Sequence, residues 1–401
     1  MRVLFLTHRL PYAPNRGDRV RAYHLLRQLR TFAEVDLISL VHDDEEAGHL
    51  EETRALATTV AGVRVPRVRN LVRAVMALPT QQPFSHVLLD APDLQPAIER
   101  IVSDHAPDVV LAFCTGIAHA VVRPPLDRFP LVLDMVDVDS AKWAALNATS
   151  APPRSWVYAR EARTLERFEI SITRRAFATT LTTDKERDTL QVLVPGARVE
   201  VMQNGVDAAS LRPPGPPAAS QTVVFCGVMN YAPNEEGAIW LAREVWPKVR
   251  RARPDARLEI IGSFPTRRVQ DVASAAGGVV VHGHVDDVRP HLWQAAVAAA
   301  PLLTARGVQN KVLEAVAAGL PTVVTPVVLE GVPNEVKPAC LTADGPRAFA
   351  EALGSLLGRS PNERREIAGR ASVDSISWER RLAELEQILV SAARTDSGAS
   401  D

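Results

Sequence analysis

The segment RGVQNKVLEAVAAGLP extends from Arg306 to Pro321 and carries the clearest structural signal in the chain. The apolar segment before it, residues 296–303, is typical of a buried parallel strand. Apolar residues then recur at helical spacing, and Gly319 stands where a helix C-cap is expected. A second apolar segment, residues 322–328, predicts the next strand. The stretch therefore predicts a strand, a tight loop, a helix and a strand, which is the repeating unit of a parallel α/β sheet.

Three charged side chains stand at or near the start of that helix, namely Arg306, Lys311 and Glu314. In open α/β sheets, ligands bind beyond the carboxyl ends of the strands, where these residues are expected. The N-terminus of a helix adds N–H donors and a partial positive charge that suit phosphate. A surface Lys–Glu pair on an amphipathic helix would give the same pattern. On this stretch alone, a phosphate site and a surface ion pair both remain open.

The composition is that of a globular protein with two domains. The chain has 401 residues, 46% of them hydrophobic, and a net charge of −1, so we expect no nucleic-acid partner. Cys114, Cys226 and Cys340 lie in apolar stretches and are expected to be free thiols in a reducing compartment. The apolar run at the N-terminus is too short for a signal peptide. No apolar run reaches the length of about 18 residues that a membrane-spanning helix needs. We therefore expect a cytoplasmic protein.

The N-terminus repeats the pattern of strand, loop and helix. Residues 3–7 predict a buried strand, and a loop with two prolines then ends at Gly17. Asp18 can cap the helix that follows. An anion could rest against the N–H donors at this position, although an ordinary βα loop fits as well. The loop lacks GxGxxG, so the fingerprint of a dinucleotide site is absent.

A basic segment in the first half, residues 63–78, places Arg64, Arg67, Arg69 and Arg73 among apolar residues. A basic amphipathic segment of this kind can lie on an anionic membrane. A solvated helix face is an equally good interpretation. Peripheral contact with the inner face of the plasma membrane thus stays open.

Acidic residues follow the strand predicted at 131–133. Asp134, Asp137 and Asp139 stand close together, which could indicate a metal site. Asp139 or Ser140 as a helix N-cap is the simpler interpretation. A single acid that orients or deprotonates an acceptor is a third.

A proline-rich stretch, residues 212–220, cannot form regular structure and is predicted to link two domains. We expect two Rossmann-like, doubly wound parallel-sheet domains that face each other across a cleft. The predicted divisions are a first domain at 1–211, the linker at 212–220, a second domain at 221–376, a C-terminal helix at 377–393 that could pack back on the first domain, and a disordered tail at 394–401.

The chain resembles the retaining GT-B glycosyltransferases of family 4. The segments that carry the resemblance are the loop ending in Gly17, Asn204-Gly205-Val206-Asp207, Leu258-Glu259-Ile260-Ile261-Gly262 with Gly283-His284-Val285 and Asp287, and Lys311-Val312-Leu313-Glu314-Ala315 with Gly319 and Pro321. The acidic run 134–140 with Trp143, and Asn230-Tyr231 with Pro233-Asn234, resemble a subgroup associated with exopolysaccharide and PEP-CTERM exosortase loci.

This resemblance implies that a nucleotide-diphosphate sugar binds mainly to the second domain and an acceptor to the first. Glu314 would bond the ribose hydroxyls, Gly17 would approach the diphosphate, and the loop at His284 would lie against the base. The donor side comprises Gly17, Gly227, Asn230, Gly262, His284, Val285, Arg306, Lys311, Val312 and Glu314. The acceptor side comprises Arg16, Asp18, Arg21 and Asp137. The residues expected to act in catalysis are Asp137, Arg306 and Lys311.

The sequence departs from the family at two places. Arg306 occupies the position of the family's first paired Glu, and the basic pair expected after Gly227 is absent. A buried diphosphate needs positive partners, so we hypothesise that Arg306 and Lys311 supply them. We expect no metal and no tightly bound cofactor.

The donor base is left open between UDP, GDP and others, and the acceptor between a sugar, a lipid-linked molecule and a small molecule. The resemblance implies a hexosyltransferase-type enzyme that retains anomeric configuration. Another nucleotide-sugar enzyme of this fold, such as an epimerase, and a non-catalytic two-domain sugar-nucleotide binding protein remain as alternatives.

Overall fold

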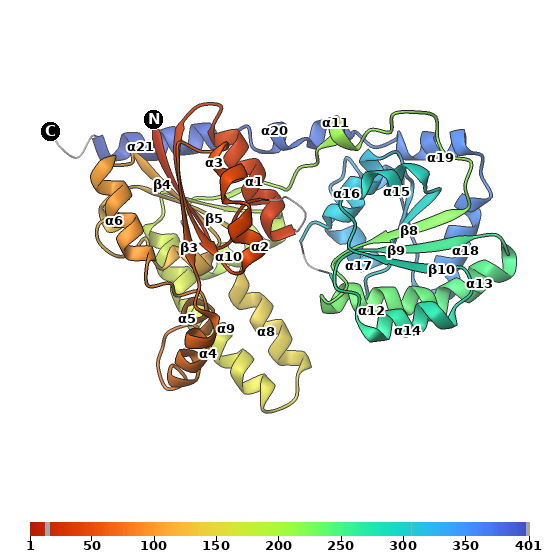
Figure 1. The fold of residues 1–401 in the computed structure, drawn as a ribbon, viewed down its shortest axis with the longest axis horizontal. Coiled ribbons are helices and arrows are strands. Elements are labelled where there is room, and N and C mark those ends of the chain that lie inside the picture. The colour runs from red at the N-terminus through yellow and green to blue at the C-terminus, as the bar shows by residue number, and fades with distance from the viewer. Residues whose placement is uncertain (13–16, 306, 398–401) are drawn as a thin grey trace. The chain divides into compact units, whose positions relative to one another are not determined.

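The computed structural model describes residues 1–12, 17–305 and 307–397. The chain forms two compact units, one made of Met1–Gln203 with the described residues from Leu382 onward, and one of Asn204–Arg381 (Figure 1). Each unit contains a parallel sheet covered by helices. The predicted fold class of two parallel α/β domains is thus confirmed.

The described residues of the first unit form a seven-stranded parallel sheet in the order β3-β2-β1-β4-β5-β6-β7. The strands are β1 (Arg2–Thr7), β2 (Glu34–Val41), β3 (Thr59–Arg64), β4 (Val109–Phe113), β5 (Leu131–Val136), β6 (Ala178–Leu181) and β7 (Val199–Val201). The apolar residues Val3 to Leu6 of β1 have no exposed surface. Such continuous burial is expected because helices cover both faces of a parallel sheet.

The helices of the first unit include one long pair, and α8 packs along α9. The helices are α1 (Gly17–Leu29), α2 (Asp44–Gly48), α3 (Leu50–Arg54), α4 (Arg67–Met76), α5 (Phe84–Leu88), α6 (Leu94–Asp104), α7 (Thr115–Ala118), α8 (Asp139–Thr149), α9 (Arg154–Arg175), α10 (Asp184–Leu193) and α21 (Leu385–Ser397), with a 3-10 turn at Leu126–Arg128.

The described residues of the second unit form a six-stranded parallel sheet in the order β10-β9-β8-β11-β12-β13. The strands are β8 (Thr222–Cys226), β9 (Arg257–Ile261), β10 (Val279–Gly283), β11 (Val297–Ala300), β12 (Thr322–Val324) and β13 (Cys340–Thr342). Figure 1 shows α12 and α14 on one face of this sheet and α15 and α16 on the other. The sheet is therefore doubly wound, as predicted.

The helices of the second unit are α11 (Ala208–Leu211), α12 (Ala232–Trp240), α13 (Trp246–Ala252), α14 (Arg267–Ala275), α15 (Arg289–Gln294), α16 (Asn310–Ala317), α17 (Pro326–Glu330), α18 (Gly345–Leu357), α19 (Pro361–Ala368) and α20 (Trp378–Arg381). A π-helical turn at Leu241–Val245 joins α12 to α13, and 3-10 turns lie at Lys337–Ala339 and Val373–Ile376.

The described residues from β11 to the start of β12 form the predicted strand, helix and strand. Gly319 adopts a φ of +81°, and the N–H of Leu320 donates to the carbonyl of Ala315 at 3.0 Å. This is the Schellman arrangement that ends a helix. The prediction of a strand over 322–328 is wrong beyond Val324, because Pro326 occupies the first turn of α17.

The proline-rich stretch 212–220 lies inside the second unit. Arg364 donates to the carbonyl of Ala218 and Arg365 to that of Gly215, each at 3.0 Å. These bonds tie the stretch to α19 although it has no regular structure. The C-terminal helical segment is divided, since α20 belongs to the second unit and α21 to the first.

Candidate functional site

The strand order of the second sheet reverses between β8 and β11. The chain proceeds outward from β8 through β9 to β10, then returns to pair β11 with β8. Helix α12 follows β8 and α16 follows β11, so both helices begin near the carboxyl edge at the reversal. Ligands of open α/β sheets bind in the crevice at this point. The candidate site is therefore built from the starts of α12 and α16.

Lys311 of α16 joins these two helices. Its Nζ donates to Oδ1 of Asn234 in α12 at 2.5 Å and lies 5.1 Å from the ring centroid of Phe225. Asn234 is buried and uses its Nδ2 to donate to the carbonyl of Val228 at 3.0 Å. A single lysine thus bridges the two elements on either side of the topological reversal.

The charge of Lys311 is only partly compensated by its surroundings. Burial lowers the pKa of Lys311 to about 8, against the opposing influence of Cys226 and Glu314. At neutral pH the amine is still mostly protonated. Because the group that accepts its hydrogen bond is a neutral amide, the positive charge is available to an incoming anion. A phosphate is a suitable ligand for such a group.

Glu314 stands one helical turn after Lys311. Burial raises the pKa of its carboxyl group, and the nearby Lys311 ammonium lowers it. A carboxylate can accept hydrogen bonds from hydroxyl groups through both oxygens. The predicted pairing of Lys311 and Glu314 on one helix face thus places a cation and an acceptor side by side.

Glycines let the loops at this edge approach one another. Gly262 adopts a φ of +147°, and a Cβ built there would lie 1.7 Å from the carbonyl oxygen of Gly227. The N–H of Gly227 donates to Ile261 and that of Met229 donates to Ser263, each at 2.9 Å. The loops after β8 and β9 therefore pack backbone against backbone, which no side chain at Gly262 would permit.

The other residues of the second unit that were predicted to bind the donor differ in their exposure to solvent. Asn230 and His284 are exposed, and Val285 is half-buried. The Nδ1 atom of His284 lies 3.0 Å from the hydroxyl of Ser263, which links the loops after β9 and β10. Val312 is fully buried, and its N–H donates to Gln309 at 2.9 Å. Its side chain packs in the hydrophobic core of the unit.

Asp137 lies just after β5 in the first unit, next to Val136, which has a φ of +70°. Its carboxylate accepts a hydrogen bond from the hydroxyl of Thr182 at 3.2 Å. Burial first, then the charges of Glu186 and Asp139, raise the pKa of Asp137 to about 6. Strained backbone and a raised pKa often occur together at functional sites.

The other acids near β5 are held by separate partners. Asp134 is buried and accepts from Nη2 of Arg21 at 2.7 Å and from its Nε at 3.0 Å. Asp139 accepts from the hydroxyl of Thr115 at 2.8 Å. The run does not converge as metal ligands would, and within the described residues it forms no metal cluster. Arg21 lies in the interior, where its guanidinium forms an ion pair with Asp134.

Two predicted cations, Arg306 and Arg16, lie outside the described residues. Gly17 and Asp18 form the start of α1. Next to Arg306, Gly307 adopts a φ of +61°, and a Cβ on Gly331 would lie 2.2 Å from the carbonyl oxygen of Gly307. A glycine at 331 thus lets α17 contact this loop.

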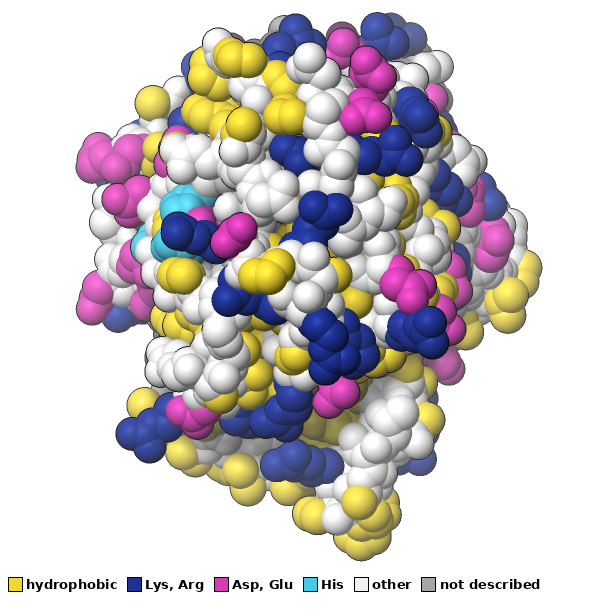
Figure 2. Space-filling view, turned by 90° about the vertical axis from the view of Figure 1, so that its right-hand side faces the viewer, with side chains coloured by type: hydrophobic (Ala, Val, Ile, Leu, Met, Phe, Trp, Pro, Cys, Tyr) yellow, Lys and Arg dark blue, Asp and Glu magenta, His cyan; other side chains and the backbone are white. Residues whose placement is uncertain are grey.

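One group of side chains among the described residues has the spacing of a metal site. It consists of Glu259 on β9, His282 on β10 and His291 on α15, with donor atoms all within 4.8 Å of one another. The Oε2 atom of Glu259 lies 3.1 Å from Nδ1 of His291 and 3.3 Å from Nε2 of His282. Two imidazoles and a carboxylate suit zinc or a similar ion. Figure 2 shows histidine side chains together at one place on a surface where acidic and basic side chains are interspersed.

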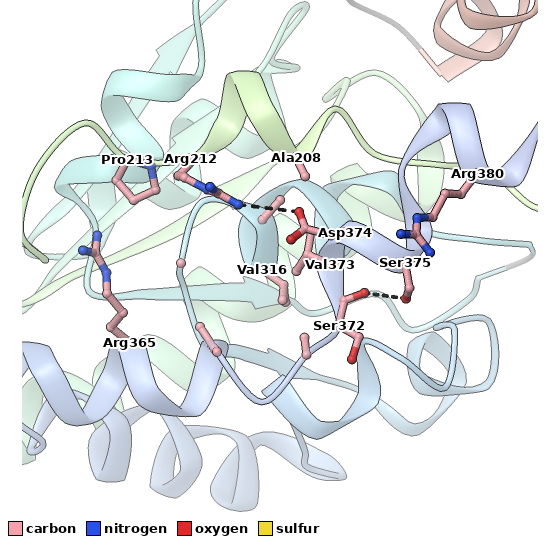
Figure 3. Close-up of a pocket in the computed structure, with 15 residues that line it drawn as sticks. Ala208, Arg212, Pro213, Val316, Arg365, Ser372, Val373, Asp374, Ser375 and Arg380 are labelled. Carbon is pink, nitrogen blue, oxygen red and sulfur yellow. Dashed lines mark hydrogen bonds and ion pairs between the residues drawn. The ribbon is translucent and has the colours of Figure 1, made fainter. Parts of the chain in front are cut away.

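A cavity of about 710 Å³ lies near the other end of α16. Val316, Ala317 and Gly319 line it together with Arg212 and residues 371–375. Figure 3 shows Arg212 directed toward Asp374, and their closest atoms are 3.5 Å apart. Because the cavity adjoins the C-terminus of α16, it lies away from the carboxyl edge where ligands bind. We therefore do not assign the donor to it.

Asn234 is a candidate site residue that the sequence analysis quoted for the subgroup resemblance but did not assign to the donor side. A buried amide at the start of a helix after β8 is a usable signal, since the first turn of such a helix faces the ligand edge. The cluster of Glu259, His282 and His291 was also not predicted. Its members are separated in the sequence, and only the pairing of β9 with β10 brings two of them together.

Comparisons with known proteins find one matching family model. Residues 220–359, which include Asn234, Lys311 and Glu314, match the family model described as Glycosyl transferases group 1. No curated protein sequence matches the chain.

Solved structures of similar fold cover nearly the whole chain. Sucrose-phosphate synthase from Thermosynechococcus elongatus has a TM-score of 0.71 at 16% identity, covering 98% of this chain and 100% of that one. Alr3699/HepE from Anabaena, in complex with UDP, has a TM-score of 0.67 at 15% identity, with coverage of 98% and 100%. A glycosyltransferase from Rickettsia africae has a TM-score of 0.64 at 10% identity, covering 98% of each chain. The two units therefore have the GT-B fold of glycosyltransferases.

Proposed function

We propose that this protein is a glycosyltransferase that moves a sugar from a nucleotide-diphosphate sugar to an acceptor hydroxyl. The match of residues 220–359 to glycosyl transferases group 1 supports this assignment. The observation that carries it is Lys311, a partly buried cation bonded to a neutral amide at the reversal of the sheet. A diphosphate group at this position would satisfy that charge.

The chemistry requires such a cation. Glycosyl transfer proceeds through an oxocarbenium-like state while negative charge develops on the departing diphosphate. Lys311, joined in our proposal by Arg306, stabilises that charge together with the N-terminus of α16. Glu314 accepts hydrogen bonds from the ribose hydroxyls, and the loops at Gly227 and His284 border the phosphates and the base.

On the acceptor side, we assign the role of a polar group near the reacting hydroxyl to Asp137. Its pKa of about 6 leaves it mostly ionised at neutral pH, so it can accept a proton or orient the hydroxyl. We further propose that the reaction retains anomeric configuration and serves exopolysaccharide or glycolipid synthesis in the cytoplasm. HepE has been solved with UDP-glucose, so UDP-sugars are the first donors to test.

Donor binding tests the proposal directly. In a thermal-shift screen with UDP-, GDP-, ADP- and dTDP-sugars, one donor class should raise the melting temperature. Lys311→Ala should weaken the binding of that donor about ten- to a hundredfold, because a charge-assisted contact to phosphate is lost. Lys337→Ala is the matched control, since Lys337 also bonds an amide oxygen, that of Asn334, at 2.9 Å in the same unit. Equal affinities in the two variants would contradict the assignment.

Product analysis distinguishes transfer from epimerisation. Incubation with the donor alone should leave the sugar unchanged, and transfer should require an acceptor. We also expect activity to persist after treatment with EDTA, since Lys311 and Arg306 supply the positive charge. Complete loss of activity that magnesium or manganese restores would refute that expectation.

A further inference from the structure

Helix α4 (Arg67–Met76) presents its apolar side to solvent. Val68, Leu71, Val72 and Val75 fall within an arc of about 100° on a helix of 3.6 residues per turn. These four side chains, with Met76, are between 59% and 79% exposed. In a helix that packs on a globular core, such an arc would face inward. Here the usual orientation is reversed.

The inward side of α4 is polar and is held by hydrogen bonds. Asn70 is fully buried, and its Nδ2 donates to the carbonyls of Asp90 at 2.7 Å and Leu88 at 3.0 Å. Arg73 forms an ion pair with the carboxylate of Asp90. From α9, Arg160 donates to the carbonyls of Ala77 and Leu78 just after α4. These bonds fix the orientation, so the exposed apolar arc is not a consequence of a loosely attached helix.

The charges around the arc indicate what covers it. Residues 63–82 contain four arginines and no acidic residue, and acidic side chains from outside this segment pair with three of them, Asp44 with Arg64 and Asp90 with Arg69 and Arg73. Arg67 and Arg69 are exposed and lie on either side of the apolar arc. An apolar stripe with basic flanks complements a surface that is negatively charged outside and apolar beneath, which is the chemistry of an anionic bilayer.

A tryptophan on the helix that holds the end of α4 is also exposed. Trp156 of α9 is 70% exposed and lies one turn before Arg160, the residue that holds the end of α4. Figure 1 shows α4 beside α9 in the first unit. Tryptophan is favoured at the level of lipid headgroups. Within the described residues no helix has the length and apolar content to cross a membrane.

We propose that α4 docks the first unit on an anionic lipid bilayer, with Val68, Leu71, Val72 and Val75 inserted at the boundary between headgroups and acyl chains. Arg67 contacts the lipid phosphates, while Arg69, whose Nη2 lies 3.6 Å from the carboxylate of Asp90, borders the other side of the arc. This inference does not depend on glycosyl transfer, because vesicle binding is measured without donor or acceptor.

Flotation with vesicles tests the proposal. The full chain should bind vesicles of equal parts phosphatidylcholine and phosphatidylglycerol, bind phosphatidylcholine vesicles much more weakly, and dissociate as salt is raised. Val68→Glu should lower the partition coefficient about tenfold or more, because an apolar contact is replaced by a repelled charge. Val192→Glu is the matched control, since Val192 in α10 of the same unit is also 79% exposed. Arg67→Gln should lower it about fivefold.

The outcomes of these experiments either support or contradict membrane docking by α4. Because Val68 is exposed, both glutamate variants should retain the wild-type melting curve, which separates loss of binding from loss of folding. Failure of the wild-type chain to bind anionic vesicles, or equal binding by Val68→Glu and Val192→Glu, would overturn the proposal. So would a lipid-free dimer that Val68→Glu dissociates, because the arc would then be an interface between two copies of the chain.

Discussion

The lowered pKa of Lys311 makes donor affinity depend on pH in a way that can be calculated. We expect that the diphosphate of the donor binds the protonated amine and not the neutral one. The diphosphate of a nucleotide sugar carries no group that titrates near neutrality, so the change in affinity belongs to the protein. The perturbation is therefore a rise in pH through the pKa of about 8.

The magnitude follows from the fraction of Lys311 that is protonated in the free protein. With a pKa of about 8, about nine-tenths of the amine is charged at pH 7 and about one-tenth at pH 9. The dissociation constant for the donor should then rise about tenfold over this range, which corresponds to about 1.4 kcal/mol. A lysine with its ordinary pKa would remain charged throughout and would give almost no change.

Isothermal titration calorimetry with the preferred nucleotide sugar measures this dependence. Lys311→Arg is the informative variant, because arginine stays protonated at these pH values and should bind the donor with little dependence on pH. The variant also subtracts any titration of the nucleotide base, which is the same in both experiments. A flat profile for the wild-type protein, or the same slope in Lys311→Arg, would refute the assignment of Lys311 to the diphosphate.

Three further outcomes are expected. Glu314→Ala should weaken donor binding about tenfold in the same calorimetric assay, with part of the affinity kept by Glu314→Gln, because the amide can still accept one hydrogen bond. Gly262→Ala should lower the free energy of unfolding by about 3 kcal/mol or more, because its Cβ would overlap the carbonyl of Gly227. Gly283→Ala, where φ is +70° and no atom lies within 4 Å, should cost only about 1 kcal/mol, and chemical denaturation compares the two. Asp137→Asn should raise stability at pH 7 by about 1–2 kcal/mol after allowance for partial exposure. Because the pKa of Asp137 is raised to about 6 from 3.8, this gain should shrink as pH falls below 6 and vanish below about 4.

The sequence was most informative where local rules and the fold agree. The segment from β11 to α16 combines a buried strand, an amphipathic helix and a glycine C-cap, and each signal is local. Lys311 and Glu314 could be selected because their place on the helix follows from spacing alone. Pro326 was a local signal as well, and its preference for the first turn of a helix explains why the strand before it is short.

These local rules could not predict contacts between side chains that lie far apart in the sequence. The sequence places Arg21 near an expected ligand loop, yet its partner Asp134 lies far along the chain and the pair is buried. Asn234 becomes significant only when α12 and α16 meet. The orientation of α4 was equally inaccessible, because the periodicity predicts an amphipathic helix without saying which side faces the core. Because the buried Asn70 donates hydrogen bonds to two backbone carbonyls, the polar side of α4 faces inward and the apolar side faces solvent.

The two groups assigned to the chemistry have pKa values that are shifted in opposite directions by one cause. Burial disfavours the charged form of each, so the pKa of Lys311 falls to about 8 and that of Asp137 rises to about 6. The proposed reaction needs Lys311 charged and Asp137 ionised, and both conditions hold only between these two values. The value of kcat/KM for the donor, which reports the free protein, should therefore follow a bell-shaped curve with limbs near pH 6 and 8. Lys311→Arg should remove only the alkaline limb, which separates the role of the cation from that of the acid.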